Sequence, residues 1–110
     1  MSNPETVLLQ EIRLALAQIP GVIVWRNAVG HDGRAHVDYG IQNPGGSDLI
    51  GFTAGPDGAI FTAIEVKTAT GRPSPHQKNF ISIVRLHGGY AGIARSVEDA
   101  ISITQGNIHD

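Results

Sequence analysis

Two charged side chains interrupt the apolar stretch FTAIEVKTATG, which covers residues 61–71. Glu65 and Lys67 stand two positions apart within it. In a β-strand, residues i and i+2 point to the same face, so the carboxylate and the ammonium are predicted to lie side by side. Such a pair could be a simple ion pair on a partly exposed strand, which contributes about 0–1 kcal/mol to stability. It could also form part of a site in which both groups act on a substrate.

A second acid, Asp48, follows the PGG turn at residues 44–46 and begins a neighbouring predicted strand. Strands paired in a hairpin lie ~5 Å apart, so Asp48 is expected to meet Glu65 across the sheet. Two carboxylates at that distance repel each other unless a proton or a cation lies between them. Oxygen ligands without cysteine or paired histidine favour Mg²⁺ or Mn²⁺. With Lys67 as a donor to a water or to a phosphate oxygen, the set predicts metal-assisted phosphodiester hydrolysis.

The elements that must position these residues follow from apolar periodicity and from cap and turn signals. We expect a helix that starts at Ser2 or Asn3 and ends at Pro20-Gly21, and a second helix capped by Ser74 with Leu86 on its apolar face. A last short helix begins at Ser96. The predicted strands are residues 22–28, 47–53, 59–69 and 90–95.

The connections predict how these strands pair. The AGPDG turn at 54–58 predicts an antiparallel hairpin, and the crossover through the second helix predicts parallel pairing of strands 59–69 and 90–95. Residues 29–46 hold five glycines and little periodicity, which indicates an irregular connection that is functional or mobile. The predicted order is αβββαβα, an α/β fold with a mixed sheet flanked by helices.

Composition limits the classes of function. A chain of 110 residues with 41% hydrophobic and 16% charged residues is typical of one soluble globular domain, here residues 1–110. The lack of cysteine excludes disulfides and thiolate metal sites and fits a reducing cytosol. No apolar run suits a membrane helix, and the N-terminus has no basic region typical of a secretory signal. The net charge of −2 does not by itself indicate a nucleic-acid binder, but acids that hold a cation contribute to that charge.

The spacing of Asp48, sixteen residues and then Glu65-x-Lys67 resembles the PD-(D/E)XK nuclease motif. Four further segments extend the resemblance over nearly the whole chain: WRN at 25–27, GGSDLIG at 45–51, AIEVKTATGRPSPHQ at 63–77 and HGGYAGIARSVED at 87–99. Together they resemble a stand-alone phage or bacterial VRR-Nuc domain, which implies a restriction-endonuclease-like αβββαβ core. Ser47 stands where the motif name has proline, a departure that concerns only the entry into the strand.

The resemblance also implies roles for individual residues. It implies that Asp48 and Glu65 bind the metal together with the backbone carbonyl of Val66, and that Lys67 is the catalytic lysine. It further implies that Gln77 lies near the metal-bound water or the phosphate, and that Glu11 is an acid of the first helix near the site. From the residues alone, Gln77 could equally be an exposed helix residue, and Glu11 could be solvated or paired with an arginine. The candidate nucleic-acid contacts are Arg26, Asn27, Arg34, Arg72, Ser74 and Lys78.

The resemblance implies a Mg²⁺- or Mn²⁺-dependent DNA endonuclease of a bacterial or phage-infected cell. Stand-alone members pair, and some resemble Holliday-junction resolvases, so a homodimer that cuts branched DNA in repair is expected. Two alternatives stay open: a nuclease that nicks or prefers single strands, and a non-catalytic nucleic-acid-binding subunit with the same fold.

Overall fold

The central feature of the computed structural model is a four-stranded mixed sheet, within a description that covers residues 3–28, 30–32, 37–39 and 45–110. Its strand order is β1-β4-β5-β6. β1 (Val22–Arg26), β4 (Leu49–Gly55) and β5 (Gly58–Val66) pair antiparallel, whereas β6 (Tyr90–Ala94) runs parallel to β5. The predicted mixed sheet, its hairpin and its crossover are therefore confirmed.

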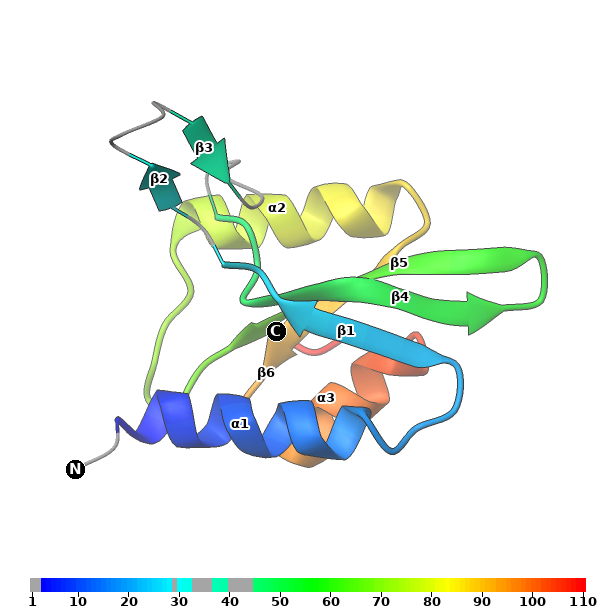
Figure 1. Cartoon of the computed structure of the whole chain (residues 1–110), viewed down its shortest axis with the longest axis horizontal. Coiled ribbons are helices and arrows are strands. Elements are labelled where there is room, and N and C mark those ends of the chain that lie inside the picture. Colours follow the sequence, from blue (N-terminus) through cyan, green and yellow to red (C-terminus); the bar gives the residue numbers. More distant parts are fainter. Residues whose placement is uncertain (1–2, 29, 33–36, 40–44) are drawn as a thin grey trace.

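Three helices cover the two faces of this sheet (Figure 1). α1 (Pro4–Leu16) and α3 (Val97–Thr104) pack on one face, and α2 (Pro75–Leu86) packs on the other. The sequence signals for their starts are confirmed, because Asn3, Ser74 and Ser96 are the N-caps. α1 ends at Leu16, before the predicted end at Pro20-Gly21, and two turns lead from there to β1.

A second, smaller sheet corrects the expectation of an irregular connection at residues 29–46. β2 (Gly30–Asp32) and β3 (Val37–Tyr39) pair antiparallel as a separate two-stranded sheet. Among the residues that the structure describes, five strands therefore precede α2 instead of the three predicted. Strands of three residues are too short to produce a recognisable period.

The core consists of two apolar layers on either side of β5. The larger layer, between the sheet and α1 and α3, contains side chains that are fully buried, among them Ile12, Leu16, Leu49, Ile64 and Ile103. The smaller layer lies under α2 and centres on Ile81 and Ile93. Leu86 was expected on the apolar face of α2, but its side chain is 81% exposed because it is the last residue of the helix. Burial on both faces fixes the carboxyl end of β5, where the charged residues lie.

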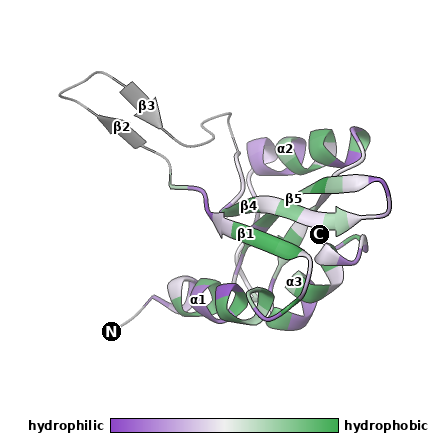
Figure 2. Ribbon diagram, turned by 45° about the vertical axis from the view of Figure 1, so that its right-hand side comes forward, coloured by the Kyte–Doolittle hydropathy of each residue, from purple (hydrophilic) through white to green (hydrophobic). Residues whose placement is uncertain are grey.

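On the face of the sheet that carries α2, a row of apolar side chains remains exposed. Ile23, Phe52 and Phe61 stand opposite one another on β1, β4 and β5, and Trp25 lies beside them. β1 forms the edge of the sheet away from β6, and its hydrophobic colouring is visible in Figure 2. The smaller apolar layer joins α2 to β4, β5 and β6 and includes no residue of β1. Among the described residues, no helix is long and apolar enough to cross a membrane.

Candidate metal and nuclease site

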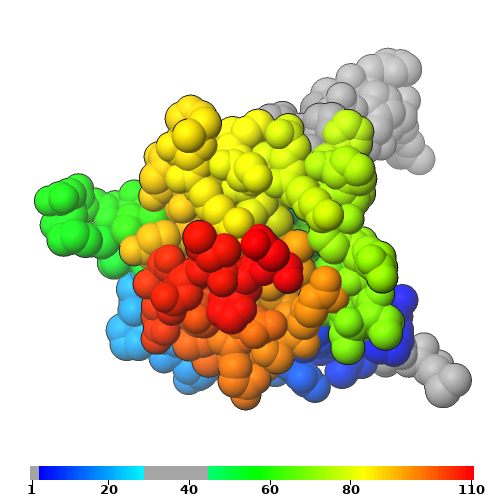
Figure 3. Space-filling model, turned by 180° about the vertical axis from the view of Figure 1, so that it is seen from behind, coloured from blue at the N-terminus to red at the C-terminus, as the bar shows by residue number. Residues whose placement is uncertain are grey.

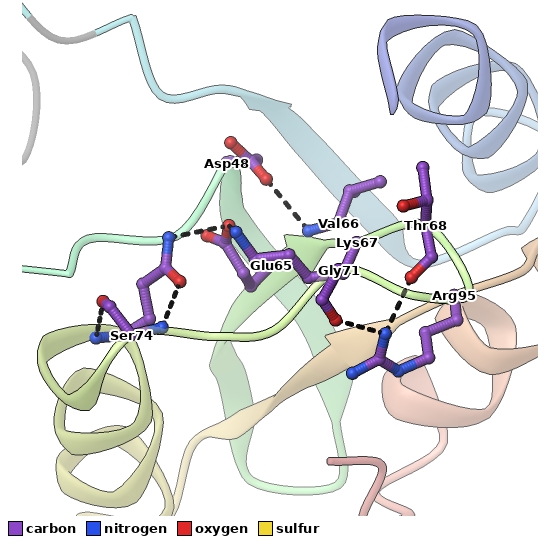
Figure 4. Close-up of polar contacts among 9 residues, drawn as sticks. Asp48, Glu65, Val66, Lys67, Thr68, Gly71, Ser74 and Arg95 are labelled. Carbon is purple, nitrogen blue, oxygen red and sulfur yellow. Dashed lines mark hydrogen bonds and ion pairs between the residues drawn. The ribbon is translucent and has the colours of Figure 1, made fainter. Parts of the chain in front are cut away.

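The carboxyl end of β5 and the residue before β4 bring two acids together. Leu49 pairs with Ile64, and one further step of this register places Asp48 opposite Glu65. The Val66 backbone N–H donates a hydrogen bond of 2.9 Å to Oδ2 of Asp48, which orients that carboxylate (Figure 4). The expected meeting of the two acids across the sheet is therefore what the structure shows.

Lys67 and Gln77 both contact the carboxylate of Glu65. Lys67 Nζ lies 3.5 Å from Oε2 of Glu65, and only 3% of the Glu65 side chain is exposed. The Gln77 Nε2 group donates a hydrogen bond of 3.1 Å to the same oxygen. The Gln77 Oε1 atom accepts a hydrogen bond of 2.8 Å from the Ser74 backbone N–H. In return, the Ser74 hydroxyl accepts a hydrogen bond of 3.1 Å from the Gln77 backbone N–H. This capping box therefore fixes the start of α2 and aims the glutamine at the acid.

A third carboxylate comes from α1, and it belongs to Glu5. Carboxylate oxygens of Glu5, Asp48 and Glu65 all lie within 4.8 Å of one another. Glu11, the expected acid of this helix, is exposed and is not part of the group. Glu11 comes six positions after Glu5, which moves it about 9 Å along the helix axis and onto another side of the helix. In the sequence, Glu5 was recognisable only as a favourable acid in the first turn of a helix, and no local signal indicated that this turn faces β5.

Burial and crowding of like charge change the acidity of Glu65. Burial of the carboxyl group, followed by the charge of Asp48 and a hydrogen bond with it, raises the pKa of Glu65 from 4.5 to about 8. Lys67 opposes this shift by its charge and its hydrogen bond. In the absence of a cation, Glu65 therefore holds a proton at neutral pH. A divalent cation would replace that proton, and a set of three carboxylates fits a hard ion such as Mg²⁺ or Mn²⁺.

A pocket of about 270 Å³ opens beside this group, between α1 and the ends of β1 and β5. Glu5, Asp48 and Val66 line it, and so does Arg26, a predicted nucleic-acid contact. The neighbouring Asn27 is buried, and its backbone N–H donates a hydrogen bond of 2.8 Å to the Asp48 carbonyl. The pocket thus places one arginine next to the carboxylates.

The remaining predicted contacts lie elsewhere. Arg72 and Lys78 line a different and larger pocket, of about 580 Å³. Ser74 is exposed and serves as the cap of α2. Arg34 falls outside the described residues. Of the five predicted contacts that the structure describes, only Arg26 and Asn27 therefore stand next to the carboxylate group.

A residue that the sequence reasoning missed, Arg95, holds the loop that links Lys67 to α2. Its Nη1 group donates hydrogen bonds of 2.7 Å to the Thr68 carbonyl and 2.6 Å to the Gly71 carbonyl (Figure 4). A Cβ atom at Gly71 would lie 3.5 Å from the Lys67 side chain, so the held loop packs against that lysine. A basic residue directly after β6 carried no recognisable signal, because its partners are backbone carbonyls 24 and 27 residues earlier.

Close backbone packing sets the position of α2 relative to Asp48. Gly45 has a φ of 84°, and a Cβ atom there would overlap the His76 backbone in the first turn of α2. Glycine is therefore required at this point both for its conformation and for the space it leaves. The result is that Gln77 reaches Glu65 from a helix that touches the chain three residues before Asp48.

Comparisons with known proteins identify the family of this chain and show its fold in another protein. The family model of the VRR-NUC domain matches residues 3–98, which include every element from α1 to β6. The chain belongs to the VRR-NUC family. A solved structure described as a VRR_NUC domain protein matches with a TM-score of 0.60 and 18% identity, covering 100% of this chain and 95% of the other. That similarity shows a shared fold. No curated protein matches the sequence.

Membership in the VRR-NUC family gives the site a chemical context. The family belongs to the PD-(D/E)XK nuclease superfamily, which implies a nuclease-type function with DNA as the substrate. Nucleases of this type use divalent metals. In this VRR-NUC chain, Glu5, Asp48 and Glu65 form a group that could hold such an ion.

Proposed function

We propose that this protein is a Mg²⁺- or Mn²⁺-dependent endonuclease that hydrolyses DNA phosphodiester bonds. The observation that carries the proposal is the convergence of three carboxylates and one ammonium at the end of β5. A structural ion pair would need one acid for Lys67, whereas here Glu65 is buried next to two further acids. Such crowding is costly without a cation, and it suits a site that binds one.

The metal ligands in this proposal are Glu5, Asp48, Glu65 and the Val66 carbonyl. Val66 lines the same pocket as Glu5 and Asp48, and its N–H already holds the Asp48 carboxylate. A bound divalent ion supplies stabilisation of negative charge on a phosphate oxygen and lowers the pKa of a coordinated water. Glu65 must release its proton when the ion binds, because its pKa is raised to about 8 in the metal-free protein.

Lys67 and Gln77 have different tasks in the proposed reaction. The Lys67 ammonium has donors beyond its contact with Glu65, and it donates to the attacking water or to a phosphate oxygen. Gln77 holds one oxygen of Glu65 through its amide group and so keeps that carboxylate in place. Arg26, beside Asp48 in the pocket, is placed to contact the DNA backbone.

The experiment that tests this proposal is a cleavage assay with labelled four-way junction, duplex and single-stranded DNA in Mg²⁺ or Mn²⁺. We expect metal-dependent cleavage by the wild type and none by Asp48→Asn. Asp57→Asn is the matched control, because Asp57 is exposed in the turn between β4 and β5. Binding of DNA without cleavage in either metal would show instead a non-catalytic nucleic-acid-binding subunit.

The finer part of the proposal concerns assembly and substrate shape. We propose that two copies pair and that branched DNA is the preferred substrate, because stand-alone members of the family pair and some of them resemble Holliday-junction resolvases. Two sites related by a two-fold axis would cut opposing strands of a junction. Sedimentation equilibrium should give twice the chain mass, and the substrate panel should show faster cleavage of the junction than of duplex. Faster cleavage of single strands by a monomer would contradict this part and leave the hydrolytic proposal intact.

A further inference from the structure

A second pocket, of about 580 Å³, lies outside the carboxylate site and is rich in positive charge. Arg72, Lys78, Arg85 and Arg95 line it, and Asp110 is the one acid among its lining residues. Figure 3 shows this face of the molecule, on which α2, the C-terminal residues and the segment before α2 come together. The pocket volume falls within the range of about 300–1,000 Å³ that holds small ligands. Its charge predicts an anionic ligand.

Two of the four cationic groups are held in fixed positions by the fold. Arg95 is anchored on the carbonyls of Thr68 and Gly71. Arg85 donates three hydrogen bonds: one of 2.9 Å from Nε to the Ala91 carbonyl, one of 3.2 Å from Nη2 to the His109 carbonyl, and one of 3.0 Å from Nη1 to the Asp110 carboxylate. The carbonyl partners of Arg95 leave the charge of its guanidinium uncompensated. Arg85 forms an ion pair with Asp110, whose side chain is 74% exposed and is therefore screened by solvent. The pocket therefore presents preorganised positive charge, which binds an anion with little loss of side-chain entropy.

The lining of the same pocket is partly apolar. Pro73, Ile81 and Ile93 contribute apolar atoms to its lining, although both isoleucines are only 2% exposed. A simple inorganic anion makes no use of such a surface. A nucleotide combines a phosphate for the arginines with a flat, weakly polar base, which can cover the apolar part of the lining.

We propose that this pocket binds a phosphate-bearing nucleotide, in the substrate strand, away from the phosphate that is cleaved. The proposal rests on the proposed function, since it assigns the pocket to the same DNA. The connection between the two sites is the loop from Lys67 to Ser74, whose carbonyls bind Arg95 and whose Gly71 packs against Lys67. A strand held at both sites would pass along this loop. Arg72, which belongs to the loop, and Lys78, which belongs to α2, both line the pocket.

The test introduces one negative charge into the pocket without changing either anchored arginine. Ser82→Glu places a carboxylate at an exposed position of α2 that lines the pocket. Ser82→Gln controls for side-chain size. Gln105→Glu adds the same charge after α3, at an exposed residue that does not line the pocket. Binding of a labelled single-stranded oligonucleotide is measured by fluorescence anisotropy in EDTA, so that it does not depend on cleavage.

We expect Ser82→Glu to weaken binding at least about tenfold at low salt, and to reduce the slope of log K against log salt by about 0.7, because it removes one phosphate contact. Both controls should stay within about twofold of the wild type. Titration with free deoxyadenosine monophosphate distinguishes the two sources of the same chemistry. If the free nucleotide competes with the oligonucleotide and Ser82→Glu abolishes this competition, the pocket also accepts a free nucleotide. If the free nucleotide does not compete, the pocket binds a nucleotide only within a DNA strand.

An unchanged oligonucleotide affinity in a folded Ser82→Glu protein would overturn the proposal, as would an equal loss in Gln105→Glu. Circular dichroism establishes folding, and Lys78→Gln provides a second, charge-removing variant that should weaken binding in the same direction. Failure of the nuclease proposal appears separately, as lack of cleavage with Mg²⁺ or Mn²⁺ by a protein that binds DNA normally.

Discussion

Replacement of Glu65 by glutamine should stabilise the metal-free protein and change how its stability depends on pH. Glutamine has nearly the same shape as a protonated glutamate and can still accept the hydrogen bond from Gln77. In the folded wild type the pKa of Glu65 is raised to about 8, whereas the unfolded chain has the ordinary value of 4.5. Between these two values the folded state holds a proton that the unfolded state has lost. The unfolding free energy of the wild type therefore falls as pH rises through this window.

The size of the effect follows from the width of the window. Each pH unit corresponds to about 1.4 kcal/mol, so a window from 4.5 to about 8 corresponds to at most about 5 kcal/mol. Glu65→Gln, which does not titrate, should match the wild type near the lower value. It should exceed the wild type by about 3 kcal/mol at neutral pH and reach a plateau above about pH 8. For a domain with a total stability of about 5–15 kcal/mol, this difference is large.

Urea unfolding of both proteins in EDTA, at several pH values from about 5 to 9, measures this difference. Glu11→Gln is the matched control, because Glu11 is an exposed glutamate in the interior of α1. Its stability relative to the wild type should not follow the same pH dependence. A difference between Glu65→Gln and the wild type that stays constant over this range would refute the reasoning, because it would mean that Glu65 is ionised in the metal-free protein.

Three further predictions concern the metal and the catalytic geometry. Lys67→Ala should bind Mn²⁺ and DNA normally but cleave about 10²–10⁴-fold more slowly in single-turnover assays, because it removes a donor and not a ligand. Wild-type cleavage by this variant would contradict the role given to Lys67. Glu5→Gln should weaken Mn²⁺ binding in calorimetry by about tenfold or more, while Glu11→Gln should not, and the reverse result would return the role to Glu11. Arg95→Lys keeps the charge but not the two-carbonyl contact, so kcat should fall about tenfold with KM for DNA unchanged. A change in KM with kcat unchanged would contradict the positioning role and leave Arg95 only its contribution to the positive charge of the larger pocket.

The positions of the strands that carry the site could be predicted because local signals and tertiary structure agree there. The turn at 54–58 fixed the register of the hairpin, and that register brought Asp48 to Glu65. Ser74 and Pro75 indicated the start of α2. The approach of Gln77 to the site was implied by the family resemblance and not by these signals. In each case the chemistry depends on residues within one hairpin or one crossover.

The rest depended on how distant segments pack, which no local pattern records. Glu5 and Glu11 are both acids of α1, and only the way that this helix crosses the sheet decides which one meets β5. Arg95 binds backbone carbonyl groups, which every residue carries whatever its side chain, so its partners left no trace in the sequence. The short strands β2 and β3 were missed because three residues are too few for a period.

The lack of a side chain at Gly45 makes the site sensitive to a purely mechanical change. The methyl group of an alanine at this position would overlap the His76 backbone, so it would push the first turn of α2 away from the segment before Asp48. The helix would have to retreat, and Gln77 would retreat with it. Every carboxylate and ammonium of the site would remain present and correctly charged. Such a protein would keep all the charged groups of the site but change the distance between Gln77 and Glu65. Its activity would show whether the reaction tolerates that change in distance.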